Sequence, residues 1–475
     1  MEDGIRFVYK RRLALRPHAK VVDNTKQISS QSVDFQSLPE GLNAHVLYQN
    51  IVSRIMSLLT LKQAVQMSMV STIFKRAWIF HPNLYFSTKT MCGSSERKGI
   101  LSSNWFIDTV NSILRKHSGL GVSKLVVKFE LRKEHAHDID GWVSFAIASK
   151  ARAVILDFSP YIGLYENNYS FPCHLFNDRN GSHLKVLRLD TVTLGPTPDF
   201  CGFASLKILT LEHVLVLDNF QHFLPKCPAL EWLKIRICPQ LHNLIVSAPL
   251  TRLKYLCVQH CAISKIELHA PNLTTFRYSG GFKVIITLHE SLKLKTATIG
   301  SPFENNLGYL FTGIPNGLPH VQRLHINVIA IATQIPGFTQ PPLKFNNLRH
   351  LSMTIAFGAD ERSGKNAVLQ LAYLLEAAPF LMDCVDLTDD PPATDVITDR
   401  PHYNLKTACI TGFNGNGGQV ALVGFILRNA VKLEKMAIDP KGRIIKNEII
   451  GESKGRRIIK SKIVPKDNNG VLVIL

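Results

Sequence analysis

One short leucine pattern recurs along this sequence, and that repetition restricts the possible folds more than any other feature. Residues 184–189 read LKVLRL, and close copies at 206–211, 230–235 and 253–258 follow at intervals of 22, 24 and 23 residues. Weaker copies begin at Leu273, Leu294, Val321, Leu348, Leu405 and Leu433. Apolar residues two apart predict a short β-strand in each copy, because an α-helix would place them three and four apart.

A strand of this kind has a single apolar edge, so neighbouring copies must stack to close a core. The spacing lies within the period of about 20–29 residues that is typical of leucine-rich repeats. We therefore expect an α/β solenoid, a leucine-rich-repeat horseshoe, over residues 100–395. Strands at 125–129 and 154–156 should open the array, and helices are expected at 104–118, 220–224 and 367–378.

The ninth position of such a repeat usually turns its side chain inward beneath the strand. Here that position holds Val192, Val214, Cys238 and Cys261, which predicts two buried and inert thiols. The alternative is that Cys238, Cys257 and Cys261 bind zinc. No second pair of cysteines with a matching spacing accompanies them, so the structural interpretation is favoured.

Two further motifs invite a site assignment. His135, His137 and Asp138 could be metal ligands, but they lie in a polar stretch that we expect to be a solvated loop. The glycine-rich segment 412–418 lacks the Lys-Ser/Thr of a phosphate-binding loop and is expected to be a turn between a strand and a helix. The sequence thus predicts no metal site, no cofactor and no catalytic residues.

Positive charge gathers at the two ends of the chain. Residues 1–20 carry six basic and two acidic groups, and residues 441–475 carry nine and three, so the ends supply +10 of the net +19. We interpret 1–36 as a mobile basic tail and 441–475 as a solvated basic segment. Neither end interleaves aromatic residues with its cations, which makes a nucleic-acid partner a weak expectation.

The rest of the composition bears on location. No stretch of 18 consecutive apolar residues is present, so a membrane span and a membrane partner are not expected. The nine cysteines form no paired framework, which is typical of a reduced chain in the cytoplasm or the nucleus.

Residues 37–86 show a different pattern. Apolar residues recur three and four apart through 51–59 and again through 61–68, which predicts short helices in a compact unit. Fewer than about 50 residues bury too little surface for strong stability alone, so a partner helix bundle would be favourable. A capping element for the repeat array is an equally good interpretation.

These residues resemble a known family. Leu38-Pro39-Glu40, the segment 51–65 and the segment 69–78 look like an F-box, and 81–86 looks like its continuation in plant F-box proteins with leucine-rich repeats. The segments 402–406, 410–413, 425–430 and 433–436 are similar to the FBD-type domain of the same proteins, which implies a strand–helix–strand cap over 400–440.

The resemblance implies a non-catalytic substrate receptor of a cullin–RING (SCF-type) ubiquitin ligase. The F-box would dock on a Skp-type adaptor, and through it on a cullin, while the repeats hold a target protein. By position, the implied adaptor-facing residues are Leu38, Pro39, Ile55, Leu58, Leu59, Leu61, Val65, Val70 and Trp78.

One departure from the family leaves a second interpretation open. About ten residues, Gly41–Asn50, stand between the Leu-Pro-Glu motif and the first helix, where family members have almost none. Either this loop is extruded, or the Leu-Pro pair is displaced and adaptor binding weakens. The alternative function is a repeat scaffold or a nucleic-acid-associated protein whose F-box no longer docks.

The outward strand positions supply the candidate substrate site. Aromatic and basic side chains gather there, and Trp, Tyr and Arg dominate binding hot spots. The residues are Arg188, Trp232, Lys234, Arg236, Tyr255, Arg277 and Arg323. They suit a partner protein with an acidic segment beside an apolar anchor. The alternative is that loops cover Trp232 and that the arginines are only solvated.

Overall fold

The computed structural model of the 475-residue chain describes part of its length. The described residues are 55, 57–70, 77–92, 102–159, 167–176, 183–196, 200–217, 220–281, 284–301, 308–330, 344–357, 378, 381, 383–389, 401–413, 415, 417–440, 444–445, 448–449 and 452–475. The expected basic tail 1–36, Leu38, Pro39, the segment Gly41–Asn50 and residues 367–377 of the expected third helix lie outside these ranges. The described residues belong to one compact unit, which spans Val52–Leu475.

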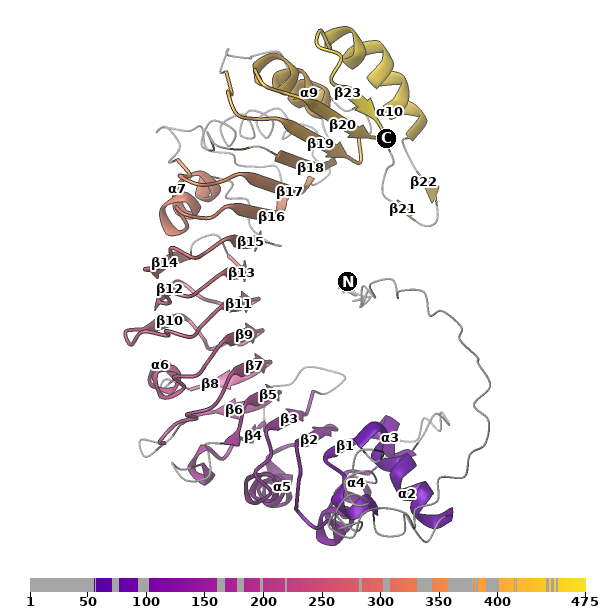
Figure 1. The fold of residues 1–475 in the computed structure, drawn as a ribbon, viewed down its shortest axis with the longest axis vertical. Helices are drawn as coiled ribbons and strands as arrows, with labels where there is room; N and C mark the ends of the chain where they lie inside the picture. Colours follow the sequence, from indigo (N-terminus) through magenta and orange to yellow (C-terminus); the bar gives the residue numbers. More distant parts are fainter. Residues whose placement is uncertain are drawn as a thin grey trace, which may run out of the picture. The chain divides into compact units, whose positions relative to one another are not determined.

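Fifteen parallel strands form one long sheet, and their order in the sheet follows their order in the chain (Figure 1). They are β1 (Asn83–Ser87), β2 (Lys124–Lys128), β3 (Ala153–Asp157), β5 (Val186–Asp190), β7 (Ile208–Glu212), β9 (Trp232–Arg236), β11 (Tyr255–Gln259), β13 (Thr275–Ser279), β15 (Thr296–Ser301), β16 (Arg323–Ala330), β17 (His350–Phe357), β18 (Asp383–Asp389), β19 (Thr407–Thr411), β20 (Lys435–Asp439) and β23 (Leu472–Ile474). The expected solenoid of parallel strands is thus confirmed.

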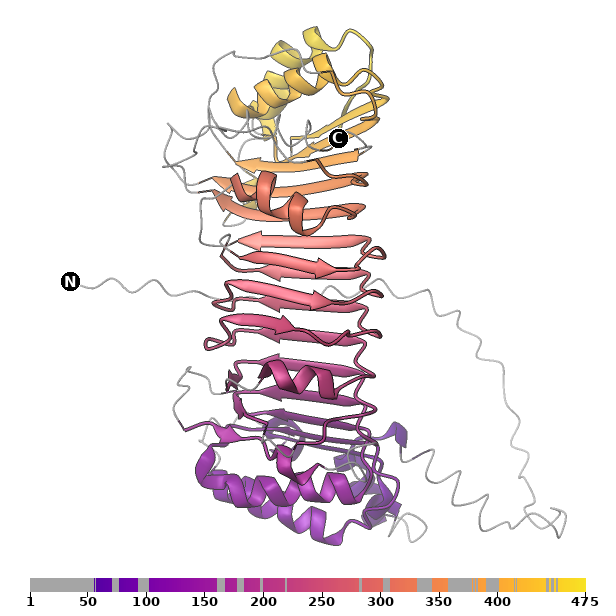
Figure 2. The ribbon, with the colours of Figure 1, turned by 90° about the vertical axis from the view of Figure 1, so that its left-hand side faces the viewer.

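Two small sheets and the helices α6 (Phe220–Phe223) and α7 (Gly308–Gly317) lie on the other face of the stack (Figures 1 and 2). Two small parallel sheets join β4 (Tyr169–Ser170), β6 (Val192–Leu194) and β8 (Leu215–Val216), and β10 (Asn243–Val246), β12 (Lys265–His269) and β14 (Ile285–His289). Further α-helices are α2 (Leu61–Val70), α3 (Thr88–Cys92), α4 (Ser103–Lys116), α5 (Ala136–Ala148), α9 (Gly417–Asn429) and α10 (Glu452–Ile458). The remaining pieces are 3-10 helices η2 (Ala77–Phe80), η3 (Lys133–His135), η4 (Cys173–Leu175), η6 (Leu224–Lys226) and η8 (Val464–Lys466), the π-helix η7 (Ile459–Ile463), and the antiparallel pair β21 (Ile444–Ile445) and β22 (Glu448–Ile449).

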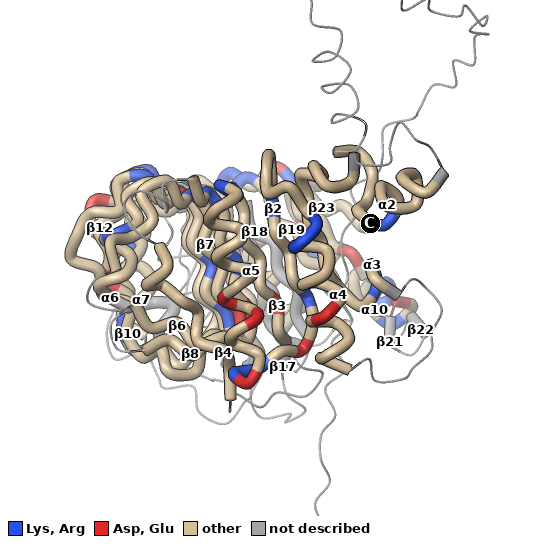
Figure 3. Tube along the Cα trace, turned by 90° about the horizontal axis from the view of Figure 1, so that it is seen from below, with Lys and Arg blue, Asp and Glu red and all other residues tan. Residues whose placement is uncertain are grey.

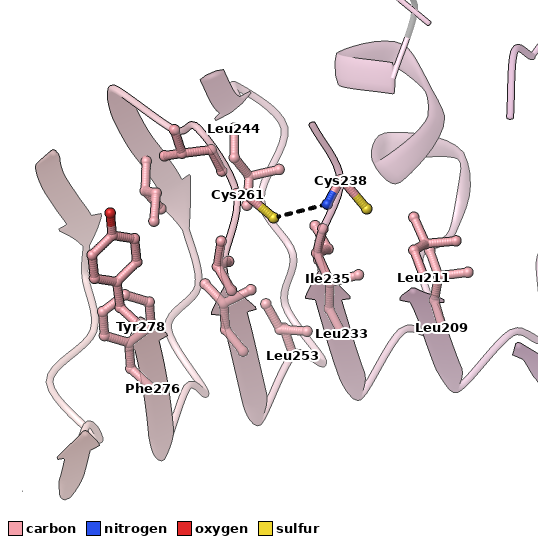
Figure 4. Close-up of a cluster of buried hydrophobic side chains, with 14 of the residues drawn as sticks. Leu209, Leu211, Leu233, Ile235, Cys238, Leu244, Leu253, Cys261, Phe276 and Tyr278 are labelled. Carbon is pink, nitrogen blue, oxygen red and sulfur yellow. Dashed lines mark hydrogen bonds between the residues drawn. The ribbon is translucent and has the colours of Figure 1, made fainter. Parts of the chain in front are cut away.

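The core follows from the alternation in each strand. In β7 and β9 the inward residues Leu209, Leu211, Leu233 and Ile235 are fully buried (Figure 4). The residues between them are more exposed, as the alternation of a strand requires. One continuous apolar cluster runs from Leu61 to Ile463, as stacked repeats require.

The ninth position behaves as expected. Val192, Val214 and Cys238 are fully buried and Cys261 is 6% exposed. The backbone N–H of Cys238 donates to Sγ of Cys261 over 3.4 Å, so sulfur replaces the amide that often links neighbouring turns (Figure 4). The hydrogen bond with Cys261 and the burial both raise the pKa of the Cys238 thiol, which agrees with an inert structural role for Cys238.

Two helical expectations are confirmed and one loop expectation is wrong. α4 fits the expected helix 104–118, and α6 with η6 fits 220–224. The stretch that contains His135, His137 and Asp138 is not a loop, because η3 and α5 occupy it. Nδ1 of His135 accepts the N–H of Arg132 at the helix start. Asp138 accepts a hydrogen bond of 2.7 Å from Asn111 on α4, so these polar groups join two helices.

The structure joins segments that sequence patterns divided. β1 lies inside the expected helical unit 37–86, yet it pairs with β2 as the first strand of the long sheet. β19 and β20 continue the same sheet, and β23 of the expected solvated segment 441–475 pairs with β20. Ile459 and Ile463 of η7 are fully buried, which corrects the picture of a solvated end.

Candidate interaction surfaces

The outward side of the long sheet carries most of the predicted substrate residues. Its register places Trp232 of β9 beside Tyr255 of β11, and Lys234 beside Cys257. Arg277 of β13 adjoins Cys257 from the other side. We call the outward residues of β3, β5, β7, β9, β11 and β13 the open face.

The first outward row of the open face is apolar and aromatic. Val186, Ile208, Trp232 and Tyr255 follow one another across four adjacent strands. The rings of Trp232 and Tyr255 stack with centroids 3.5 Å apart and planes 10° apart. The guanidinium carbon of Arg277 lies 5.8 Å from the Tyr255 ring centroid. Trp232 remains 40% exposed, so the loops among the described residues do not cover it.

The next two rows differ in charge. The middle row contains the cations Arg188, Lys234 and Arg277, and the last row contains the acids Asp157, Asp190 and Glu212 followed by the cation Arg236. Alternation along each strand already predicts that Asp190 and Glu212 share the outward face with the cations, and the register adds which of these side chains are neighbours.

Glu212 changes the expected role of two cations. It accepts a hydrogen bond from Lys234 and lies 3.9 Å from a guanidinium nitrogen of Arg236. Burial alone would raise the pKa of Glu212, but the hydrogen bond from Lys234 and the two positive charges outweigh it and lower the pKa. Lys234 and Arg236 are therefore engaged within the chain, which makes Arg277 the more available cation beside the aromatic pair.

The other two predicted arginines lie farther along the sheet. Arg188 sits two strands from Lys234, and Arg323 of β16 sits three strands from Tyr255 in the same row. Both are exposed. The structure brings together five of the seven predicted residues, and leaves these two as separate points on the same face.

The helical region before β1 forms a second surface. Thr60 caps α2, because its Oγ1 accepts the N–H of Gln63 and the Gln63 side chain accepts the N–H of Thr60. The backbone of Leu59 is held by a hydrogen bond between its carbonyl oxygen and Nε2 of His81, which lie 3.1 Å apart. Ile55, Leu58 and Met69 are 39%, 81% and 75% exposed.

The expected adaptor-facing set divides into two groups. Ile55 and Leu58 are exposed, whereas Leu61 is only 8% exposed and belongs to the core. This burial leaves little of the Leu61 surface for an outside partner, and its assignment as an adaptor contact stays a prediction. Val65 and Trp78 also pack against the core. The Val70 side chain lies outside the described part of the structure, and the exposure of Met69 was not predicted.

No group of three metal-binding side chains occurs among the residues that the structure describes. Within the same residues, no helix has both the length and the apolar character needed to cross a membrane.

Comparison with known proteins agrees with this architecture. The family model for the At1g61320/AtMIF1 leucine-rich-repeat domain matches residues 113–474, more than half of the chain. The chain therefore belongs to this family of plant leucine-rich-repeat proteins.

Named relatives in Arabidopsis thaliana are of the same kind. One that is named for an F-box, an FBD and leucine-rich repeats, At5g62970, is 26% identical over 361 residues, which cover 70% of this chain and 75% of the relative. The F-box/FBD/LRR-repeat protein At1g13570 is 28% identical over 289 residues, 58% of this chain and 60% of the relative. The F-box/LRR-repeat protein At2g42730 is 22% identical over 355 residues, 70% and 74% of the two chains.

Proposed function

We propose that the chain is the non-catalytic substrate-recognition subunit of an SCF-type cullin–RING ubiquitin ligase. Residues 37–86 would act as the F-box and dock on a Skp-type adaptor, which joins them to a cullin. The repeats would hold a target protein, and β19, α9 and β20 would form the FBD-type cap. The observation that carries the proposal is an exposed apolar surface at α2 in a chain whose relatives are named for an F-box.

The adaptor contact would rest on Ile55, Leu58 and Met69. Leu58 and Met69 leave 81% and 75% of their surface exposed, which is costly for a chain with no partner at this position. Covering one such side chain contributes about 1.5–3 kcal/mol. Leu61 and Trp78 would instead pack against the core and so anchor the F-box region to the repeat array.

Charge substitution tests this division. Leu58→Asp combined with Met69→Asp should abolish pull-down of a Skp-type adaptor and leave the thermal unfolding temperature nearly unchanged, because both side chains are exposed. Leu217→Asp is the matched control, since Leu217 is a 44% exposed leucine at the end of β8. Full adaptor binding by the double variant would reject this docking surface, and loss of binding in the control would show a general effect of added charge.

The target site would lie on the open face around Trp232, Tyr255 and Arg277. The stacked rings offer a rigid apolar platform, and Arg277 places a cation at its edge, which suits an aliphatic or aromatic anchor next to a carboxylate. Losing a central anchor commonly costs about 2 kcal/mol, which is about thirtyfold in Kd.

The target can be captured by proximity labelling and then used as the probe. Trp232→Ala and Arg277→Glu should each release it while adaptor binding stays intact. Ile285→Ala is the control, because Ile285 is 60% exposed on the small sheet away from the open face. Unchanged affinity in both open-face variants would move the target site elsewhere. Absence of adaptor binding together with salt-dependent retention on a nucleic-acid column would favour the scaffold alternative.

A further inference from the structure

The long sheet begins each strand with a regular line of side chains that the proposed function does not use. From β3 to β17, the residue immediately before each strand of this sheet donates its backbone N–H to the carbonyl of the residue immediately before the preceding strand. Such bonds link Lys185 to Arg152, Lys207 to Lys185 and Lys295 to Thr274 over 2.8, 2.8 and 3.0 Å. The line is unbroken from Ser123 to Arg349, so its side chains stand about 4.8 Å apart, one strand spacing.

This line is strongly basic. Between Ser123 and Arg349 it contains six cations and one acid, and each of these cations is exposed. The cations are Arg152, Lys185, Lys207, Lys254, Lys295 and Arg349. The acid is Glu231, which lies 3.0 Å from Nζ of Lys207 and 2.9 Å from Nζ of Lys254. Figure 3, which looks along the stack, shows Lys and Arg gathered along its upper edge.

Tight turns add to the same edge just before the strands. The N–H of Leu294 donates to the carbonyl of Ser291 and encloses Leu292 and Lys293 at the tip of a turn. An equivalent bond from Leu433 to Ala430 encloses Val431 and Lys432. Arg252 occupies the same tip position two copies before Lys293. We call this line and these turn tips the basic edge.

The turn tips also expose large apolar side chains. Leu292 is 74% exposed and Val431 is 59% exposed. Leu120 and Tyr403, at the equivalent positions before β2 and β19, are 68% and 61% exposed. Protruding apolar tips among cations are typical of surfaces that enter the headgroup layer of a bilayer while the cations contact anionic lipids.

We propose that the basic edge docks the protein on a membrane surface that contains anionic lipids. The cations would lie at the headgroups, and Leu120, Leu292 and Val431 would insert at the boundary with the acyl chains. A nucleic acid would also bind the cations, but its bases stack on aromatic side chains and gain little from exposed aliphatic ones. The apolar tips therefore decide between the two kinds of polyanion.

Sedimentation of the full chain with vesicles tests the proposal. We expect binding to phosphatidylcholine vesicles that contain phosphatidylserine, little binding to phosphatidylcholine alone, and weakening with salt. Reversing two charges in Lys293→Glu with Lys295→Glu should lower the partition coefficient about tenfold or more. Leu292→Ser should lower it severalfold, because that tip would no longer enter the bilayer.

Matched controls separate the basic edge from net charge. Lys460→Glu with Lys462→Glu removes the same charge from exposed positions of η7, and Ile285→Ser removes an apolar side chain from the small sheet. Both controls should bind as the wild type does, and all variants should keep the wild-type unfolding temperature. Undiminished vesicle binding by the Lys293 and Lys295 variant would overturn the proposal. Preferential binding of an RNA or DNA oligonucleotide, lost with these lysines but kept in Leu292→Ser, would overturn it in favour of nucleic acid.

Discussion

A lysine at the C-terminal end of α5 adopts a backbone conformation that favours glycine. Lys150 has φ of 56°, in the left-handed region, just after the helix. Its N–H donates to the carbonyl of Ile147 over 3.0 Å, and that of Ala151 donates to Ala146 over 2.9 Å. These two bonds define the Schellman motif, in which the left-handed position is normally glycine. Lys150 is exposed, so its replacement removes little burial.

Lys150→Gly should therefore stabilise this end of α5. The left-handed conformation costs an L-residue about 1–2 kcal/mol, and glycine avoids this cost. Glycine also loses more conformational freedom on folding, which offsets about 0.5–1 kcal/mol of the gain. A net gain of about 0.5–1 kcal/mol remains, which should slow hydrogen exchange through local opening about two- to fivefold. The assay is native-state amide exchange of peptides covering 142–152.

The control is a glycine where the backbone is ordinary. Lys116 is an exposed residue in the last turn of α4, and Lys116→Gly should speed exchange there, because glycine costs a helix about 1 kcal/mol. Faster or unchanged exchange at the end of α5 in Lys150→Gly would refute the assignment of strain to Lys150.

Three further predictions concern the array. Gly202 has φ of 105° and a Cβ there would overlap a backbone carbonyl, so Gly202→Ala should lower the free energy of unfolding by more than about 1 kcal/mol, measured by denaturant titration. The hydrogen bond with Asp190 raises the pKa of His213 above 6.5 despite burial, and Asp190→Asn should lower this pKa in an NMR titration. The stabilisation from this pair is present below the ordinary histidine pKa and should be lost as pH rises through the raised value. Iodoacetamide should alkylate exposed Cys201 in the native protein but reach Cys238 only after unfolding, as mass spectrometry can establish.

Periodicity revealed the strands wherever leucine marked them. The interval of 57 residues between the copies at Leu348 and Leu405 concealed β18, because its segment begins Leu381-Met-Asp-Cys384 and lacks the usual second leucine. β1 was missed for another reason: most of its residues fall inside the segment 37–86 that was expected to be helical, although they pair with β2. A strand's membership of a sheet depends on distant pairing, which local spacing does not express.

Predicting the open face and the basic edge from the sequence also required the register of neighbouring strands. The outward positions of Trp232 and Tyr255 followed from alternation, but the ion pairs of Glu212 with Lys234 and Arg236 required knowledge of neighbouring strands. The basic edge was overlooked because charge was counted by position along the chain, which emphasised the termini. The expectation of no membrane partner rested on the absence of an apolar span, and an amphipathic edge needs none.

Amide hydrogen exchange of the full chain, with and without a Skp-type adaptor, would decide whether α2 and the residues before it form the docking surface. We predict slower exchange in peptides that cover 57–70, where Leu58 and Met69 are exposed, and unchanged exchange in peptides that cover β9 and β11. Unchanged exchange over 57–70 at saturating adaptor, or protection confined to the open face, would rule out the assignment of this surface to the adaptor.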